Sequence, residues 1–235
     1  MIVVTVPAYN ESRFLEKCVE KLLAETSLLN DDFRIVIAED GSTDGTDEIA
    51  RNLELLHPRV VHLHSYKRLG RGAALKNAWN KVKGDVYLFV DCDLATDMMY
   101  YPRLIGAIME GHDLAIGSRH VAGATVRRPL LRELASRVYN LLVRVMFRDG
   151  VRDHQLGFKA FSSQLITDLL EKCESNDWFW DTEIIVRSVR YGYRWLEFPV
   201  EWEEKKTKKT RIKRLIEDMY IHGTGLLKLR ARLSQ

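Results

Sequence analysis

The chain has 235 residues, of which 46% are hydrophobic and 29% are charged, and its formal net charge is +3 at pH 7. These values are typical of a globular protein with one large or two small domains and a full hydrophobic core. The small net charge gives no reason to expect a nucleic-acid partner, and no apolar run approaches the ~20 residues of a membrane-spanning helix. Met1 leads directly into a strand-like run instead of a signal peptide, and the three widely spaced cysteines indicate a reducing compartment.

Strand-like and helix-like segments alternate along the first half of the chain. Strands are expected at residues 2–6, 34–38, 60–63, 85–90 and 113–117, and helices at residues 11–24, 47–56, 73–82 and 102–109. The second half continues with a long arginine-bearing helix, a strand at 157–161, two helices, a strand at 194–200 and a basic tail. This alternation predicts an α/β fold with a mainly parallel sheet and helices on both faces.

Asp91 and Asp93 directly follow the apolar run at 85–90, which has the composition of a buried parallel strand. Residues two apart on a strand project to the same side, so the two carboxylates share a small volume and repel each other. A divalent cation relieves that repulsion, and oxygen ligands suit Mg²⁺ or Mn²⁺. The carboxyl ends of strands are also where open α/β sheets bind ligands. A solvated loop or a helix N-cap is the alternative for this stretch.

Three further motifs follow strand ends in the first half. Residues 6–11 predict a turn in which Asn10 or Ser12 caps the next helix. Residues 39–46 also have turn and cap chemistry, although two acids there could instead grip a base and a ribose. Residues 68–76 form a glycine-rich entry to a helix N-terminus with nearby cations, which suits phosphate. Leu75 stands at the third-glycine position, so this is not a dinucleotide fingerprint.

The order and spacing of these motifs resemble the nucleotide-sugar half of the family 2 glycosyltransferases, which have the GT-A type nucleotide-diphospho-sugar transferase fold. Residues 117–119, 132–136 and 153–159 are similar to the branch that glycosylates a polyprenyl phosphate, the dolichyl-phosphate mannose synthases and dolichyl-phosphate glucosyltransferases. The element at 157–159 and residues 93–96 look closer to the glucosyltransferases. The resemblance implies inverting, metal-dependent transfer of a hexose from a nucleotide-diphosphate sugar, of the UDP-glucose or GDP-mannose class, to polyprenyl (dolichyl) phosphate.

The resemblance also implies residue roles. The base and ribose would be held by Pro7, Tyr9, Glu11 and Asp40, with Lys76 nearby. Asp91 and Asp93 would hold Mg²⁺ or Mn²⁺ on the diphosphate, with Asp93 counted as catalytic. The acceptor phosphate would be bound by Arg119, Arg132, Ser136 and Lys159, of which Arg119 and Arg132 are also counted as catalytic. The chain departs from the mannose synthases at Ala95, where they tend to carry Gln, and from relatives that carry Thr and Cys at positions 154 and 156.

The acceptor can be argued from the residues themselves. Residues 127–148 contain six arginines, one acid and no lysine. A phosphate monoester, with a second pKa of about 6, is already an anionic nucleophile at pH 7, and arginine forks position it. This pattern favours a phosphate acceptor. One alternative is transfer to a sugar or glycan hydroxyl with Asp181 or Glu183 as general base, although both acids also suit a helix N-terminus. A sensor that binds a nucleotide sugar without transferring it is the non-enzyme alternative.

The expected organisation is a glycosyltransferase domain at 1–203, with a nucleotide-sugar half at 1–97 and an acceptor half at 98–203, and a basic amphipathic tail at 204–235. Seven lysines and arginines between residues 205 and 214 precede apolar residues at helical spacing. Each cation near an anionic leaflet adds roughly 1 kcal/mol of attraction, so we expect a peripheral protein on the cytoplasmic face of a membrane. A packed core helix is the alternative for the tail. Six histidines are expected at the surface: His57, His62, His64, His112, His120 and His222.

Overall fold

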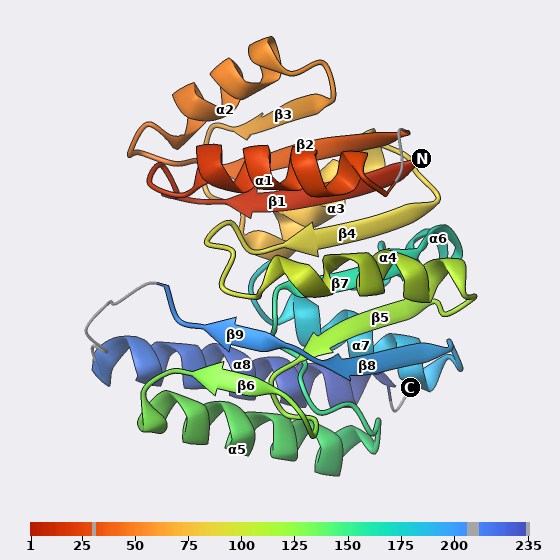
Figure 1. Ribbon diagram of the computed structural model, residues 1–235. Coiled ribbons are helices and arrows are strands. Elements are labelled where there is room, and N and C mark those ends of the chain that lie inside the picture. The colour runs from red at the N-terminus through yellow and green to blue at the C-terminus, as the bar shows by residue number, and fades with distance from the viewer. Residues whose placement is uncertain (30–31, 206–211, 234–235) are drawn as a thin grey trace.

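The computed structural model describes residues 1–29, 32–205 and 212–233, with the backbone alone for residues 212–220. Within these residues a seven-stranded sheet runs through the molecule in the order β3-β2-β1-β4-β7-β5-β8 (Figure 1). Its strands are β1 (Ile2–Ala8), β2 (Phe33–Asp40), β3 (Val60–Ser65), β4 (Val86–Val90), β5 (Leu114–Ser118), β7 (Phe158–Ser162) and β8 (Trp195–Pro199). Only β7 runs antiparallel to its neighbours in this sheet, so the predicted mainly parallel sheet is confirmed.

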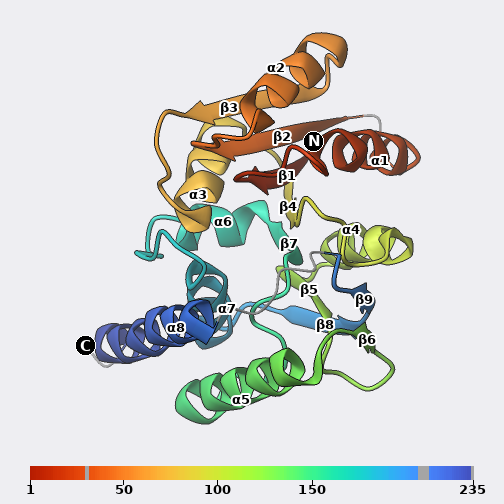
Figure 2. The same ribbon diagram turned by 90° about the vertical axis from the view of Figure 1, so that its left-hand side faces the viewer.

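Helices cover both faces of the sheet (Figure 2). One face carries α1 (Leu15–Ser27), α2 (Thr46–Leu56) and α4 (Tyr101–Met109), with the short 3-10 helix η1 (Met98–Tyr100) before α4. The other face carries α3 (Arg71–Lys81), α6 (Ser163–Leu169) and α7 (Trp180–Arg190). The apolar spacing that predicted these helices is the spacing of their buried residues, as with Leu15, Val19 and Leu22 on α1.

Four aromatic rings form the centre of the core between the sheet and the helices α3, α6 and α7. Trp79 lies 5.6 Å from Trp180 and 5.5 Å from Phe161, between ring centroids, and Phe89 stacks on Phe161 at 6.1 Å. The indole N–H of Trp79 donates to Thr5 Oγ1 at 2.9 Å, so its polar atom is satisfied. This packing fixes β4 relative to α3 and α7, and with it the residues that follow β4.

Two long helices, α5 (Leu130–Phe147) and α8 (Ile212–Leu233), lie side by side at the β8 end of the molecule (Figures 1 and 2). The second half of α8 packs inward, because Leu226 and Leu229 join Val143 of α5, Val186 of α7 and Phe179, which precedes α7, in a third apolar cluster. Part of the expected tail is therefore a packed helix. Its basic residues 206–211 lie outside the described residues, as do the side chains of 212–220.

A two-stranded parallel sheet is formed by β6 (Thr125–Arg127) and β9 (Glu201–Glu203). Residues 95–97 run along β9: the N–H of Glu203 donates to the Ala95 carbonyl, and the N–H of Asp97 donates to the Glu201 carbonyl. Neither short strand is predicted by the sequence. They place Trp202 beside the loop that follows Asp93. No helix in the described part of the chain is both long enough and apolar enough to cross a membrane.

Candidate active site

The residues expected to act together gather at one edge of the sheet. β1, β2, β4 and β5 end there, and β7 begins there because it runs the other way. The N–H of Asp91 donates to the carbonyl of Gly157 at 2.9 Å, so the two segments touch. A Cβ on residue 157 would lie 2.2 Å from the Asp91 carboxylate, and glycine is therefore needed for this approach. The antiparallel strand thus brings the 153–159 motif against the aspartate pair.

A buried arginine, Arg71 at the start of α3, lies between two acids. Its Nη2 atom is 2.8 Å from Asp91 Oδ1, and its Nε atom is 3.6 Å from Asp181 Oδ2. The guanidinium also lies over the ring of Phe89 at 4.9 Å and that of Trp178 at 4.7 Å. Burial alone would lower the pKa of Arg71, but Asp181 and Asp91 more than reverse this effect and raise it. Arg71 therefore stays charged and neutralises part of the acidic site. The sequence did not single it out.

Two further buried ionisable groups, Asp181 and Lys159, lie near Arg71. Burial raises the pKa of Asp181, against the opposing charges of Arg71 and Lys159. Lys159 is fully buried, donates to the carbonyl of Leu156, and lies 5.4 Å from the centroid of the Phe89 ring. Burial lowers the pKa of Lys159 to about 8. These contacts place Lys159 in the interior, beside Phe89, rather than in an open acceptor pocket.

The aspartate pair has the donor chemistry of a hard divalent cation. The Asp91 side chain is 35% exposed, and Asp93 Oδ1 accepts from the N–H of Ala95 at 3.2 Å. Carboxylate oxygens next to a substrate diphosphate are the ligands that Mg²⁺ uses in such sites, and Mn²⁺ accepts the same set. The residues present therefore fit the expected ion.

Hydrogen bonds tie the first two strand-end loops of the nucleotide-sugar half together. Asn10 Oδ1 accepts from the N–H of Thr43 at 2.8 Å, and the N–H of Asn10 donates to Ser42 Oγ at 3.0 Å. The N–H of Glu11 donates to Thr46 Oγ1 at 2.8 Å. Asn10 has a left-handed backbone (φ 56°), which asparagine tolerates. Neither Asn10 nor Ser12 caps α1, which begins at Leu15 with no side-chain cap. The predicted cap is wrong, because these loop groups bond the neighbouring loop instead.

Asp40 and Tyr9 lie at the same edge, while Lys76 points into a protein contact. Asp40 accepts from the N–H groups of Leu69 and Gly70, at 2.7 and 2.9 Å, and so anchors the loop before α3. The ring of Tyr9 lies 4.1 Å from the guanidinium carbon of Arg68. Lys76 Nζ donates to the carbonyl of Cys173 at 3.1 Å. Pro7 is a β1 residue paired with Ala38 of β2.

The glycine-rich entry to α3 is explained by close packing. A Cβ on Gly70 would lie 2.3 Å from the carbonyl oxygen of Asn176, and one on Gly72 would lie 2.6 Å from the Cβ of Trp180. The N–H of Ala73 donates to the same Asn176 carbonyl at 3.1 Å. The first turn of α3 is thus covered by the segment before α7, and its glycines serve this contact.

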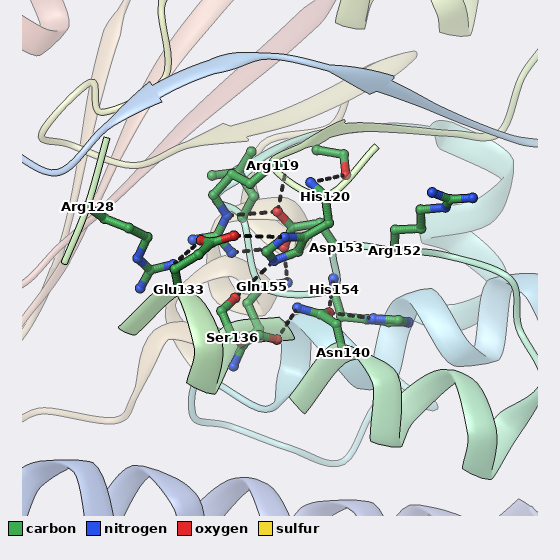
Figure 3. Close-up of polar contacts among 12 residues, drawn as sticks. Arg119, His120, Arg128, Glu133, Ser136, Asn140, Arg152, Asp153, His154 and Gln155 are labelled. Carbon is green, nitrogen blue, oxygen red and sulfur yellow. Dashed lines mark hydrogen bonds and ion pairs between the residues drawn. The ribbon is translucent and has the colours of Figure 1, made fainter. Parts of the chain in front are cut away.

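In the acceptor half, Arg119 is held by a buried carboxylate (Figure 3). Its Nε and Nη2 atoms donate to the two oxygens of Asp153 at 2.8 and 2.9 Å, and its backbone N–H donates to the same group at 3.0 Å. Burial alone would raise the pKa of Asp153, but the charge and hydrogen bonds of Arg119 overcome it and lower that pKa. A phosphate at Arg119 would therefore meet a guanidinium whose orientation is already fixed.

Arg132 and Ser136 lie one turn apart on α5, as predicted, and each has a partner. Arg132 Nη1 forms an ion pair with Glu204. Ser136 Oγ and His120 Nε2 are hydrogen-bonded at 3.1 Å, and His120 is next to Arg119 in the chain. The other ring nitrogen of His120 is 3.6 Å from Glu133 Oε1. The prediction that His120 is a surface residue is wrong, because α5 covers its ring.

Arg128 is a further cation of this cluster that the sequence counted but did not single out. Its side chain is only 13% exposed, and its guanidinium carbon lies 5.2 Å from the centroid of the Trp202 ring, which Arg119 also contacts at 5.3 Å. Its nearest acid is Glu133 at 4.0 Å. Nε and Nη1 are buried without a hydrogen-bond partner among the described residues. Burial, followed by the charge of Arg119, lowers the pKa of Arg128 to about 10.

A buried hydrogen-bond network supports the loop that carries Asp153 (Figure 3). The ring of His154 lies between Asn140 Oδ1 of α5, at 2.9 Å, and Asp149 Oδ2, at 2.8 Å. The N–H of His154 donates to the same Asn140 oxygen at 2.9 Å. This network fixes the loop to α5, so that Asp153 can hold Arg119 in place. Networks of this kind are rigid when every member is satisfied.

A family model described as glycosyl transferase family 2 matches residues 3–173. The chain belongs to this family. Among similar proteins, the glycosyltransferase AglD of Haloferax volcanii is 44% identical over 228 residues, which cover 96% of this chain and 36% of AglD. This chain thus spans about a third of that relative.

The names of two further relatives refer to dolichyl phosphate and to polyprenol monophosphomannose. A dolichyl-phosphate beta-glucosyltransferase of Trichomonas vaginalis is 31% identical, over 97% of this chain and 75% of that protein. The polyprenol monophosphomannose synthase of Mycolicibacterium smegmatis is 30% identical, over 86% of this chain and 77% of that protein. The expected family and the assignment as a glycosyltransferase are confirmed.

The fold is similar to solved glycosyltransferase structures. Glucosyl-3-phosphoglycerate synthase from Mycobacterium tuberculosis, crystallised with Mn²⁺, uridine diphosphate and phosphoglyceric acid, superposes with a TM-score of 0.74 at 21% identity. The match covers 98% of this chain and 78% of that one. The predicted GT-A fold is therefore confirmed.

Proposed function

We propose that this family 2 glycosyltransferase moves a hexose from a nucleotide-diphosphate sugar to a polyprenyl phosphate, with inversion at the anomeric carbon. The UDP-glucose and GDP-mannose classes of donor both remain within the proposal. The names of two relatives and the cation cluster of the acceptor half support it. The donor would lie over the first two loops and the aspartate pair, and the acceptor phosphate would lie beside Trp202.

The observation that carries this proposal is the pair formed by Arg119 and Arg128 on the ring of Trp202. Burial, and after it repulsion from the guanidinium of Arg119, lowers the pKa of Arg128. The buried Nε and Nη1 of Arg128 make no hydrogen bond with a described residue, and leaving such donors unsatisfied costs about 1–3 kcal/mol or more. A phosphate dianion would satisfy both needs, whereas a neutral sugar hydroxyl would leave the charge unbalanced.

The proposed step is a single displacement. An oxygen of the acceptor phosphate attacks the anomeric carbon, that carbon's bond to the diphosphate oxygen breaks, and the nucleoside diphosphate leaves with the electron pair. Because the phosphate is already ionised at pH 7, no protein base has to remove a proton. The arginines position the nucleophile, and this is the contribution that bidentate donors make best.

Asp91 and Asp93 would hold Mg²⁺ or Mn²⁺, and such an ion stabilises negative charge that develops on a leaving diphosphate. Arg71 supplies a fixed positive charge 2.8 Å from Asp91 in the same place. Mn²⁺ and uridine diphosphate in the crystals of the mycobacterial synthase are consistent with this assignment. Tyr9, Glu11 and Asp40 are proposed for the base and ribose, with Pro7 shaping the end of β1. Lys76 is assigned to this side from the family resemblance alone.

We also propose that α5 lies on an anionic membrane surface, where a lipid acceptor would be met. Seven apolar residues of α5 are between 49% and 86% exposed: Leu130, Leu131, Leu134, Val138, Leu141, Leu142 and Val145. Arg137 and Arg144 line a pocket of about 390 Å³ beside this row, together with Leu134, Val138 and Leu141. An apolar row flanked by arginines suits acyl chains next to anionic headgroups. The proposed attachment thus includes α5 as well as the tail.

Transfer to a sugar hydroxyl is a second candidate, and one observation favours it. Asp181 lies next to Arg71, which contacts Asp91, and burial raises the pKa of Asp181 toward the range of a general base. Against this role, Asp181 is 1% exposed. Glu183 is already engaged, because it accepts from Arg187 Nε at 3.0 Å and from the N–H of Ser175 at 2.9 Å.

The test is to incubate the protein with UDP-glucose and with GDP-mannose in the presence of three acceptors: a polyprenyl phosphate, the matching polyprenol and a free glycan. Mass spectrometry then identifies the products. We expect a glycosylated polyprenyl phosphate with at least one donor, and no product with the polyprenol. Products on the glycan alone would support transfer to a sugar hydroxyl. Binding of the nucleotide sugar without any product would support a sensor that does not transfer.

A further inference from the structure

A group of metal-ligating side chains lies at the outer edge of the sheet, away from the aspartate pair. His62 and His64 belong to the edge strand β3, and Glu39 belongs to the neighbouring β2. The strand register pairs Glu39 with His64 and Ile37 with His62, so these side chains share one face of the sheet. The strand order places β4 three strands away from β3, on the order of 14 Å.

The three side chains converge. Each offers one ligand atom, and these atoms all lie within 4.8 Å of one another. Glu39 Oε2 is 2.6 Å from His64 Nδ1, while Glu39 Oε1 accepts from the N–H of Ser42. The Nε2 atom of His62 is buried and has no hydrogen-bond partner among the described residues. A buried imidazole nitrogen in that situation carries a desolvation cost that a bound ligand would remove.

We propose that Glu39, His62 and His64 form a second cation site, specific for Zn²⁺ or a similar transition metal. Two imidazoles and a carboxylate are a Zn²⁺ donor set, whereas Mg²⁺ prefers oxygen ligands alone. The ligand bonds of a tetrahedral Zn²⁺ site are about 2.1 Å, which places ligand atoms about 3.4 Å apart. The Glu39–His64 pair, now 2.6 Å apart, would open slightly, and every pair already lies within 4.8 Å. The His64 side chain is 30% exposed, so the fourth position opens to water.

The state of the three side chains suits metal binding. The Nε2 atom of His62 makes no hydrogen bond with a described residue, so it is available to a metal ion. Glu39 is 2% exposed and its second oxygen is already oriented by Ser42, which acts as the supporting contact that metal ligands usually have. Ser42 Oγ in turn accepts from the N–H of Asn10. A bound cation would therefore join the edge strand to the two loops of the nucleotide-sugar half.

The experiment uses the whole chain carrying Asp91→Asn and Asp93→Asn, which removes the carboxylate charges of the other site. Isothermal titration with Zn²⁺ is expected to give one equivalent bound. His62→Ala or His64→Ala in the same background is expected to weaken binding at least tenfold. His112→Ala is the matched control, because His112 lies in the other half of the chain, beside α4, and its substitution should leave the affinity unchanged.

Two further measurements identify the ligands. Co²⁺ in place of Zn²⁺ is expected to give the visible absorption of a tetrahedral site, and His64→Ala should remove it. Zn²⁺ should also raise the melting temperature of the background protein, but not that of the His64 variant, since a ligand that binds only the folded state stabilises it. His64 is exposed, so this variant is expected to fold. The proposal is overturned if no Zn²⁺ binds once Asp91 and Asp93 are changed, or if both histidine variants bind Zn²⁺ as tightly as their parent.

Discussion

The guanidinium of Arg71 lies 2.8 Å from the carboxylate of Asp91, and the same side chain reaches Asp181 at 3.6 Å. The proposed metal ligand and the alternative general base therefore share one buried cation. Without Arg71, the buried carboxylate of Asp181 would lose a neighbouring positive charge, and Asp91 would lose its ion-pair partner. A change at Arg71 would therefore affect the proposed metal site, the alternative general base and the stability of the fold.

Replacing Arg71 should thus destabilise the fold, and removing an acid should restore part of the loss. Arg71→Met is expected to lower the free energy of unfolding by about 3–5 kcal/mol, the usual cost of leaving a buried charge unpaired. Adding Asp181→Asn should recover part of it, because one buried carboxylate charge is then gone. Denaturant unfolding of the two single variants and the double variant measures the coupling. Strictly additive effects would show that the two side chains do not interact.

The aspartate pair gives a prediction about the metal. Asp93→Ala is expected to abolish transfer while leaving the fold intact, because losing a ligand removes several kcal/mol of stabilisation from the leaving diphosphate. Asp97→Ala is the matched control, since the Asp97 side chain caps η1 by accepting from the N–H of Met99 and alanine keeps the backbone N–H that bonds Glu201. Activity is followed by product formation with added Mg²⁺ or Mn²⁺. Undiminished turnover in excess EDTA would rule out a metal-dependent reaction.

Much of the fold follows from the sequence. The alternating strand and helix signals locate the main elements to within a few residues, because their apolar periodicity is the periodicity of their buried faces. The start of α1 was placed too early. Residues 11–14 have helical composition, yet Glu11 and Ser12 donate their N–H groups to Thr46 and Asp44 of the neighbouring loop. β6 and β9 were missed because three-residue strands are defined by their partner and carry almost no pattern of their own.

The sequence predicts site residues well where the residue type alone indicates the chemistry. It predicts them less well where the role depends on a contact with a residue far away in the chain. Asp91 and Asp93 follow a strand end, which is a local signal. Arg71 was passed over because its meaning depends on Asp181, more than a hundred residues away in the sequence. His64 is exposed, as predicted, but its contact with Glu39 could not be foreseen for the same reason: Glu39 lies opposite it only once β2 and β3 have paired. The apolar periodicity of a strand does not reveal which residue of a neighbouring strand lies opposite it.

Acid should weaken the contribution of the Arg119–Asp153 pair. Because the folded state lowers the pKa of Asp153, its stabilisation is complete above its unfolded value of about 3.9 and is lost as the pH falls toward the lower folded value. Asp153→Asn is expected to cost about 3–5 kcal/mol at pH 7. The difference from the parent should hold down to about pH 5 and shrink below pH 4. Urea unfolding at pH 7, 5 and 3.5 tests this, and a constant difference would contradict it.

Membrane attachment through the apolar face of α5 can be distinguished from a general charge attraction between the protein and anionic vesicles. Leu134→Gln combined with Leu141→Gln should weaken sedimentation with anionic vesicles, because both side chains are more than half exposed on the proposed contact face. Leu55→Gln is the matched control, since Leu55 is 78% exposed on α2. The remaining binding should fall with salt, as charge attraction is screened within about 10 Å at 0.1 M. Equal pelleting of the α5 and α2 variants would exclude this face.

The two hypotheses for the acceptor, a phosphate or a hydroxyl, predict opposite patterns of activity. Arg128→Ala and Arg132→Ala are each expected to reduce transfer to polyprenyl phosphate by roughly ten- to a hundredfold, since a charged hydrogen bond contributes about 1.5–3 kcal/mol. Lysine at either position should restore only part of the rate, because a point charge lacks the bidentate fork. The affinity for the nucleotide sugar should stay nearly unchanged. Product formation and donor titration are measured on the same variants.

The controls decide which group activates the acceptor. Arg51→Ala is the control for both arginine variants, because Arg51 lies on α2, outside the acceptor half, is 59% exposed and pairs with Asp47 at 3.9 Å. It should transfer at nearly the parent rate. Asp181→Asn should also have little effect on the chemical step, since an ionised phosphate needs no base. If Asp181→Asn is inactive while Arg128→Ala and Arg132→Ala are nearly normal, the nucleophile is a hydroxyl whose proton Asp181 removes, and the arginines serve only to hold α5 in place.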